Sequence, residues 1–450
     1  MTNKEIIEAV KEHPGNKVKF AIIDIDGVLR GKYIHKDKFF DNLDHGYGFC
    51  DVVYGWDSAD KLYNKSSITG WERGFPDGIA KIDLESFRPI PWDNDVPFFL
   101  ADYSAGDKME AVCPRSLLKK IVTKAEGMGY FPQYALEFEW FNFHKSEANN
   151  QSALKPQPQP IFDGMFGYSL VRIAQGSNYF NDIFDLCEAF DIKLEGLHTE
   201  TGPGVFEAAI QKDAILKAAD KAALFKTAIK EIAHPYDITP SFMAKWNQNL
   251  PGCSGHMHQS LLDENGKNVF YDQKAKPHMS PLMESFLAGQ MEALPYLMPF
   301  FAPTVNSYKR LVEGAWAPTT LTWGFDNRTT ALRILNDRPE TTRIEHRVAG
   351  ADVNPYLAMA AGLASGLYGI ENNLRLDTPA FEGDAYSNGR LKSLPDNLHD
   401  ANIAMKRSKL AKEILGEDFI SHFAVTRDHE WNEYVSSVSD WELKRYFEII

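Results

Sequence analysis

The amino-acid sequence predicts an α+β protein with a small, mostly β N-terminal domain, residues 1–106, and a large domain of mixed helices and strands, residues 107–450. Two observations carry this prediction. Residues 33–98 are rich in Gly, Asp, Tyr and Trp and show no long helical pattern. From Pro114 onward, apolar residues at helical spacing are interleaved with short segments of strand character.

Short apolar runs define the expected elements of the N-terminal domain. Ile6, Ile7 and Val10 recur at helical spacing and predict a short amphipathic helix. Residues 18–25 form an apolar run that is typical of a buried strand, and a glycine and a basic turn follow it. A second apolar run at 97–103 is expected to close the domain as another strand.

Helices are expected at several places in the large domain. Pro114 suits the first position of a helix that ends near Gly127. A second helix is expected over residues 209–232. The most apolar stretch, residues 353–370, opens at an Asn-Pro pair and is interpreted as a buried helix rather than a membrane span. Strands are expected near 133–142, 193–200, 254–260 and 342–348.

Composition excludes several classes of function. The formal net charge of -14 argues against nucleic acid or an anionic membrane as a general partner, because both need a basic surface. The polar N-terminus lacks the apolar core of a signal peptide. The 4 cysteines are scattered, without CxxC spacing, which favours a reduced cytoplasm. We therefore expect a cytoplasmic globular protein.

Four glutamates are the first candidates for a functional site. Glu137 and Glu139 alternate along an expected strand and so share one face, where two carboxylates repel each other unless a cation lies between them. Glu200 and Glu207 flank a Gly-Pro-Gly turn that can bring both carboxylates to one point. Each pair taken alone is also compatible with a solvated strand edge.

Two further segments repeat the same alternation. His256 and His258 share a strand face after a glycine-rich approach. Arg343, Glu345 and Arg347 also occupy every second position of an expected strand. Burying a carboxylate between two guanidinium groups brings little stability, because the cost of desolvation offsets the Coulomb attraction. This row therefore suggests a metal ion on the carboxylate and anionic substrate groups on the arginines.

Together these side chains indicate metal-assisted chemistry on phosphate. The set offers five carboxylates and an imidazole, which suits Mg²⁺ or Mn²⁺ better than zinc. Five arginines, whose forks bind phosphate and carboxylate, fall within one short region: Arg310, Arg328, Arg333, Arg343 and Arg347. The combination implies a nucleoside triphosphate and an acidic substrate.

Several of these segments resemble the signatures of glutamine synthetases. They are residues 254–261 (SGHMHQSL), 306–312 (NSYKRLV), and 343–347 (RIEHR) followed by Asn354-Pro355-Tyr356. The similarity extends from residues 84–92 (LESFRPIPW) to about residue 370, in the family's order.

The resemblance implies an N-terminal β-grasp domain and a catalytic domain with an antiparallel sheet and surrounding helices. It implies ATP, Mg²⁺ or Mn²⁺, and glutamate as ligands. It also implies active sites shared between neighbouring subunits of stacked rings, expected here as a homododecamer.

The resemblance also assigns roles to individual residues. The metal positions are Glu137, Glu139, Glu200, Glu207, His256 and Glu345. The nucleotide positions are His258, Ser260, Arg333 and Arg343, with Arg328 also on the phosphates. The glutamate positions are Arg310, Arg347, Gly255 and His256. The catalytic set is Arg310, Arg328 and Glu345, together with Trp316 at the site of the nucleophile.

Trp316 is where the chain departs from the family. Glutamine synthetases carry a Glu two residues before an Ala-Pro pair, where it binds and deprotonates ammonium. This chain has Trp316 at that position, before Ala317-Pro318, and an indole cannot act as a base. The sharper interpretation is a larger amine nucleophile, as in γ-glutamylpolyamine or γ-glutamylmethylamide synthetases. In the alternative, Glu313 or another acid replaces the missing Glu and ammonia is still used.

For a diamine, a distant carboxylate is expected to hold the second charge. Asp51, Asp57 and Asp60 are loose candidates for that role.

Two other classes of protein compete with the ligase interpretation. Residues 24–27 (DIDG) imitate the nucleophile motif of haloacid-dehalogenase-type phosphatases, but the βα units which that fold needs do not follow. We therefore interpret Asp24 and Asp26 as strand-end residues. A catalytically inactive relative is the other alternative, and it is disfavoured because every matched metal position is present.

Overall fold

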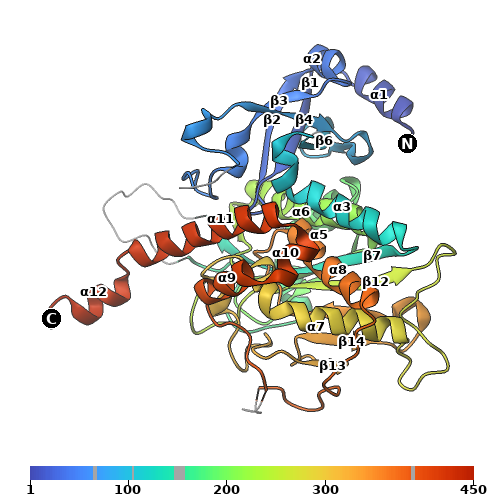
Figure 1. Cartoon of the computed structure of the whole chain (residues 1–450). Coiled ribbons are helices and arrows are strands. Elements are labelled where there is room, and N and C mark those ends of the chain that lie inside the picture. The colour runs from blue at the N-terminus through green and yellow to red at the C-terminus, as the bar shows by residue number, and fades with distance from the viewer. Residues whose placement is uncertain (64–67, 104–105, 146–157, 387–390) are drawn as a thin grey trace.

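The computed structural model describes residues 1–63, 68–103, 106–145, 158–386 and 391–450. Its N-terminal part is a six-stranded sheet in the order β2-β1-β6-β4-β3, with β5 paired to β6 (Figure 1). The strands are β1 (Lys17–Ile23), β2 (Leu29–His35), β3 (Tyr47–Cys50), β4 (Asp77–Ile82), β5 (Arg88–Ile90) and β6 (Val96–Tyr103). β1 and β6 run parallel and the other pairs antiparallel. Two helices join this sheet, α1 (Asn3–Glu12) and α2 (Lys36–Asn42).

The larger part is built on a nine-stranded sheet in the order β13-β14-β15-β12-β7-β9-β8, with β10 and β11 also paired to β7. Its central strands are β7 (Phe131–His144), β8 (Leu194–Thr199), β9 (Val205–Ile210) and β12 (Gly255–Leu262). The others are β10 (Asp213–Ala214), β11 (Ile238–Ser241), β13 (Trp323–Phe325), β14 (Leu332–Leu335) and β15 (Arg343–His346). The expected antiparallel pairing holds except between β13 and β14, which run parallel.

Ten helices of the described residues accompany this sheet, and Figure 1 shows most of them beside it. They are α3 (Pro114–Gly127), α4 (Leu170–Gln175), α5 (Ser177–Ala189), α6 (Ile215–Ala233), α7 (Pro281–Phe301), α8 (Pro355–Glu371), α9 (Leu398–Arg407), α10 (Lys409–Leu415), α11 (Glu417–Ser436) and α12 (Asp440–Tyr446). α6 packs against β7, where the ring of Phe225 stacks on Phe138 with centroids 6.2 Å apart. α7 and α8 approach closely at Gly289, where a Cβ atom would lie 2.2 Å from the carbonyl oxygen of Ser365.

Most of the expected elements are confirmed, and the α+β fold class with them. The helix at Pro114 begins at that residue, and the apolar stretch forms α8 with Asn354 as its N-cap. No helix among the described residues is long and apolar enough to cross a membrane. The expected helix over 209–232 is wrong at its start: α6 begins at Ile215, because residues 205–210 pair as β9 between β7 and β8. Tertiary pairing overrides the helical tendency of the alanines there.

Buried polar contacts join the two sheets. The Arg115 guanidinium in α3 pairs with Asp220 in α6 at 2.9 Å and with Asp102 in β6 at 2.6 Å. Asn354, which caps α8, donates to the carbonyl oxygens of Asp24 and Ile25 just after β1, at 2.9 and 3.2 Å. The proposed domain boundary at residue 106 falls between the two sheets.

The two aspartates of the phosphatase-like motif have structural partners. Asp24 is buried and accepts from the Val28 amide and the Arg30 guanidinium, both at 2.8 Å. Asp26 pairs with Arg427 of α11. Neither lines the main cavity described below, which agrees with their interpretation as strand-end residues.

Candidate active site

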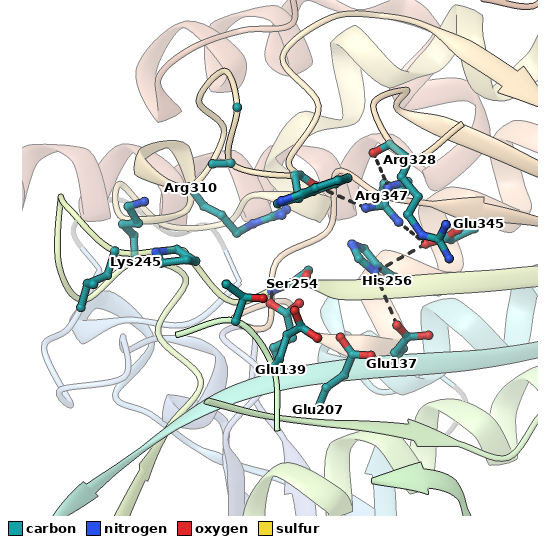
Figure 2. Close-up of a pocket in the computed structure, with 18 of the residues that line it drawn as sticks. Glu137, Glu139, Glu207, Lys245, Ser254, His256, Arg310, Arg328, Glu345 and Arg347 are labelled. Carbon is teal, nitrogen blue, oxygen red and sulfur yellow. Dashed lines mark hydrogen bonds and ion pairs between the residues drawn. The ribbon is translucent and has the colours of Figure 1, made fainter. Parts of the chain in front are cut away.

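A cavity of about 790 Å³ lies at the nine-stranded sheet and collects nearly all of the predicted site residues. Figure 2 shows Glu137, Glu139 and Glu207 on one side, the arginines Arg310, Arg328 and Arg347 on the other, and His256 between the two sides. The predicted residues that line the cavity are Glu137, Glu139, Glu200, Glu207, His256, His258, Arg310, Trp316, Arg328, Arg333, Arg343, Glu345 and Arg347.

Strand register explains why these distant segments meet. Glu139 of β7 lies opposite Glu207 of β9, which in turn lies opposite His198 of β8. Glu137 of β7 lies opposite His256 of β12. Because residues directly opposite in a sheet stand close together on the same face, the sheet gathers these ligand-type side chains into one row.

A chain of polar contacts orients His258. The Nε atom of Arg343 donates to Nδ1 of His258 at 3.1 Å. The other ring nitrogen of His258, Nε2, lies 3.2 Å from Oε2 of Glu137. Since Nδ1 accepts from arginine, the proton of the neutral ring resides on Nε2 and is directed at Glu137. Arg343 therefore acts on the carboxylate cluster through a histidine.

Glu345 is clamped between two arginines. Its Oε2 atom lies 2.7 Å from Nη1 of Arg333 and its Oε1 atom 2.5 Å from Nη1 of Arg347. His256 is 3.5 Å away from the same Oε1 atom. Burial opposes ionisation, but His256 and Arg347 lower the pKa of Glu345 to about 2. In this structure Glu345 is thus ionised and faces arginines as well as the histidine.

The surroundings shift the pKa values of two neighbouring carboxylates of the cluster in opposite directions. Burial raises the pKa of Glu207, and the charges of Glu137 and Glu139 raise it further. Burial also acts on Glu137, but His256 and His258 beside it hold its pKa well below the usual range. With all of these carboxylates ionised, the cluster would contain more negative charge than the protein around it offsets, which is the condition that a bound cation relieves.

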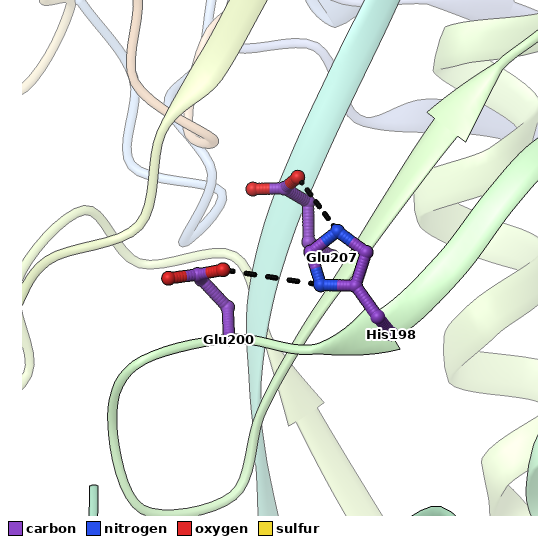
Figure 3. A group of neighbouring side chains, drawn as sticks. All are labelled: His198, Glu200 and Glu207. Carbon is purple, nitrogen blue, oxygen red and sulfur yellow. Dashed lines mark ion pairs between the residues drawn. The ribbon is translucent and has the colours of Figure 1, made fainter. Parts of the chain in front are cut away.

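The residues present fit a divalent metal. Ligand atoms of His198, Glu200 and Glu207 all lie within 4.8 Å of one another, and Figure 3 shows one ring nitrogen of His198 directed at each of the two carboxylates. Neither ring nitrogen of His256, which is buried, has a hydrogen-bond partner among the described residues. Oxygen-rich sites with few imidazoles suit Mg²⁺ or Mn²⁺.

The opposite wall is built to receive anions. Arg310 is buried, its Nη2 atom donates to the carbonyl oxygen of Val348, and its Nε atom has no hydrogen-bond partner among the described residues. Arg347 is also buried and donates to the carbonyl oxygens of Arg328 and Trp316 at 3.1 and 3.3 Å. A buried guanidinium with an unused donor is a binding position for a carboxylate or a phosphate.

Two predicted residues do not line the cavity. The Ser260 hydroxyl donates to the carbonyl oxygen of Gln133 at 3.3 Å, inside the sheet. Gly255 is needed for packing, since a Cβ atom there would lie 2.5 Å from the carbonyl oxygen of Gly350. Gly252 lines the cavity instead, against the side chain of Arg310.

Several residues of the site were missed by sequence reasoning. His198 stands two residues before Glu200, a spacing that could have identified it on the expected strand 193–200. Tyr168 stacks on the His198 ring with centroids 4.3 Å apart and lines the cavity. Lys245 lines it as well, and no local pattern marks either Tyr168 or Lys245.

Trp316 lies in the cavity wall with Glu313, on the loop after Arg310. Its backbone has a φ of 56°, a left-handed conformation that is uncommon for a bulky residue, and 65% of its surface is exposed. The carbonyl oxygen of Trp316 is held by Arg347, whereas its indole is free to meet a ligand or a neighbouring chain.

Comparisons with known proteins agree with this site. A family model described as glutamine synthetase, catalytic domain, matches residues 111–446. Type-1 glutamine synthetase 2 of Dictyostelium discoideum is 48% identical over 99% of this chain and 86% of its own length. Glutamate–isopropylamine ligase of a Pseudomonas species is 35% identical over 99% of this chain and 98% of its own length. The solved GmaS/ADP complex matches with a TM-score of 0.84 and 27% identity, covering 98% of this chain and 99% of that chain.

The family resemblance inferred from the motifs is thereby confirmed over nearly the whole chain. The protein belongs to the glutamine synthetase family and is a ligase that forms a carbon–nitrogen bond between glutamate and ammonia or an amine.

Proposed function

We propose that the protein is an ATP-dependent ligase that transfers the γ-glutamyl group of glutamate to an amine larger than ammonia, releasing ADP and phosphate. The observation that carries this proposal is Trp316, an indole in the cavity wall at the position where the family's ammonium-binding Glu is expected. An indole has no basic site, but its face packs against alkyl groups and attracts cations. A polyamine or a small alkylamine has both an alkyl chain and, when protonated, a positive charge.

The carboxylate cluster and the arginine wall both contribute to the first half-reaction, in which ATP phosphorylates the γ-carboxylate of glutamate. ATP supplies the phosphoryl group, and Mg²⁺ or Mn²⁺ bound at Glu137, Glu139, Glu200, Glu207, His256 and Glu345 supplies charge stabilisation. Arg310 holds the carboxylate of glutamate with its unused donor. Arg328, Arg333 and Arg347 offset the negative charge that builds up on the transferred group.

The second half-reaction needs a group that takes a proton from the amine. Glu313 is the carboxylate nearest to Trp316 in the sequence that also lines the cavity, and its side chain is exposed. We assign it the role of binding the incoming protonated amine and removing its proton. The free amine then attacks the activated γ-carbon, and phosphate leaves with the electron pair of the broken bond.

Phosphate release with glutamate and ATP tests the proposal across ammonium, methylamine, isopropylamine, ethanolamine, putrescine and spermidine. We expect kcat/KM for at least one organic amine to exceed that for ammonium by tenfold or more, with mass spectrometry identifying the γ-glutamyl amide. A preference for ammonium contradicts the larger nucleophile. No release with any amine favours the inactive relative.

Ammonia is the second candidate nucleophile, and the relative that is 48% identical, a type-1 glutamine synthetase, favours it. In this alternative, too, Glu313 removes the proton, here from ammonium. The Glu313→Gln variant should therefore lose phosphate release with whichever nucleophile the parent prefers: a loss with ammonium fits a glutamine synthetase, and a loss with an organic amine fits the ligase proposed above.

We further propose that the chain works in the cytoplasm as stacked rings, with twelve subunits expected. Asp51, Asp57 and Asp60 lie in the segment that follows β3 of the N-terminal sheet, and none of them lines the main cavity of its own chain. In a ring, the sheet of one subunit can approach the cavity of the next, where one of these carboxylates would hold the second charge of a diamine.

A further inference from the structure

A second cavity, of about 210 Å³, lies between the N-terminal sheet and helix α6. For scale, an apolar cavity of about 150 Å³ binds benzene in another protein. The present cavity thus has room for one aromatic or branched aliphatic side chain. Its lining residues come from β1, β2, β5, β6, the turn after β5, the end of α5 and α6: Lys19, Ala21, Leu29, Gly31, Ile90, Trp92, Phe98, Phe190, Leu224, Thr227, Ala228 and Glu231.

The body of this cavity is apolar and partly aromatic. The rings of Trp92 and Phe190 meet edge to face with centroids 4.9 Å apart, and Phe98 stands 6.2 Å from Phe190. Leu224 and Ala228 of α6 add aliphatic groups to the lining. Such a lining favours an apolar group of limited size.

Two opposite charges stand in the same lining. The Nζ atom of Lys19 lies 3.7 Å from Oε1 of Glu231, beyond hydrogen-bond distance. The Nε1 atom of Trp92 donates to the other carboxylate oxygen of Glu231 at 2.6 Å, which fixes the orientation of that side chain. The side chains of Lys19 and Glu231 remain 26% and 37% exposed, so both can accept a further partner.

We propose that this cavity binds a zwitterionic α-amino acid with an apolar side chain. The side chain enters among Trp92, Phe98 and Phe190, the α-ammonium pairs with Glu231, and the α-carboxylate pairs with Lys19. A ligand with one charge satisfies one of the two groups and leaves the other without a new partner. A ligand with both charges replaces the loose 3.7 Å contact with two ion pairs.

The cavity is separate from the active site. Among the described residues, none lines both cavities. α6 stands between them, since Phe225 of that helix packs on Phe138, which lies between Glu137 and Glu139 in β7. Binding at the new site can therefore be measured while the active site is occupied.

Isothermal titration of the full-length protein with L-phenylalanine tests the proposal, with glutamate at saturation to block the active site. We expect one binding site per chain. We also expect 2-phenylethylamine and 3-phenylpropanoate, each with one charge, to bind at least tenfold more weakly than L-phenylalanine. Equal affinity for either probe overturns the zwitterion assignment, and no binding of L-phenylalanine overturns the site.

Substitutions of the lining residues test where L-phenylalanine binds. Glu231→Gln keeps an oxygen that accepts from Trp92 but removes the charge, and we expect it to weaken L-phenylalanine binding at least tenfold. Glu195→Gln is the matched control at an exposed carboxylate of β8, and it should bind like the parent. Ala228→Phe fills the cavity and should abolish binding, with phosphate release and circular dichroism reporting whether it folds. Unchanged binding in Glu231→Gln overturns the location, whatever the outcome for Ala228→Phe.

Discussion

At the scale of the residue, Glu207 illustrates how the site prepares for a cation. It is buried against Glu137 and Glu139, and burial and these like charges raise its pKa well above the ordinary value for a glutamate. Without bound metal the raised pKa favours the protonated carboxyl, and a metal ion must displace that proton in order to bind.

The Glu207→Gln substitution should separate metal binding from folding. We expect the affinity for Mg²⁺ or Mn²⁺ and the rate of phosphate release to fall at least about 100-fold, because a ligand is lost. The midpoint of thermal unfolding without metal should not fall, since the neutral amide mimics the protonated carboxyl. Calorimetric metal titration and thermal denaturation measure the two effects. A large loss of stability without metal would show that Glu207 is ionised and structurally required.

For Trp316 we predict a gain in the use of ammonium when the residue is replaced. Trp316→Glu restores the carboxylate that the family carries at this position. We expect the ratio of kcat/KM for ammonium to that for the preferred amine to rise by about tenfold or more, since a change of pocket size and charge of this kind alters discrimination on that order. Initial rates with both nucleophiles provide the ratio. Trp316→Phe, which keeps an aromatic face, should leave the ratio near that of the parent.

At the scale of the element, α8 depends on its N-cap. Asn354 accepts from the Tyr356 amide at 3.1 Å and donates to two carbonyl oxygens that follow β1. Asn354→Ala should lower the free energy of unfolding by roughly 2–4 kcal/mol, because it removes a cap and leaves buried carbonyl groups without donors. Urea denaturation measures the loss. Asn397→Ala, which removes the cap of the more exposed helix α9, should cost about 1 kcal/mol.

Helix α11 should make the protein sensitive to acid. Burial of His422 in this helix lowers its pKa to about 4. In the unfolded chain a histidine titrates near 6.5. Between about pH 6.5 and 4 the unfolded state therefore binds one more proton than the folded state, and the free energy of unfolding decreases as the pH is lowered. The slope for one such group is up to about 1.4 kcal/mol per pH unit. His422→Gln should flatten the pH dependence of the unfolding midpoint, and His45→Gln, at an exposed histidine, should not.

At the scale of the whole molecule, the C-terminal segment supports the ring assembly proposed above. In Figure 1, α12 projects away from the body. Its region exposes large apolar side chains: Val438, Trp441, Leu443, Phe447, Ile449 and Ile450. Exposed apolar groups gathered in this way mark a contact surface.

Removal of residues 437–450 should therefore reduce the oligomeric mass. We expect the full chain to have the mass of a ring assembly by light scattering, and the shortened chain to have a smaller one with its secondary structure retained. The double substitution Lys444→Ser and Glu448→Ser keeps the apolar residues and serves as the control. An unchanged mass after truncation would exclude this surface from the assembly.

The sequence by itself determined the local chemistry and most of the elements. Alternation along expected strands identified Glu137 with Glu139 and Arg343 with Glu345 and Arg347, because a period of two places such side chains on one face whatever surrounds the strand. Pro114 and the Asn354-Pro355 pair marked helix starts for equally local reasons.

Only the tertiary structure decided which of these faces meet, and where a local tendency fails. Register across β8, β9, β7 and β12 brings His198, Glu207, Glu139 and His256 into one site, although they are far apart in the chain. The same pairing turns residues 205–210 into a strand against their helical tendency. Gly252 rather than Gly255 lines the cavity for a related reason, since close packing against Gly350 is a contact between distant segments. Such contacts depend on the whole fold, and no spacing within a segment encodes them.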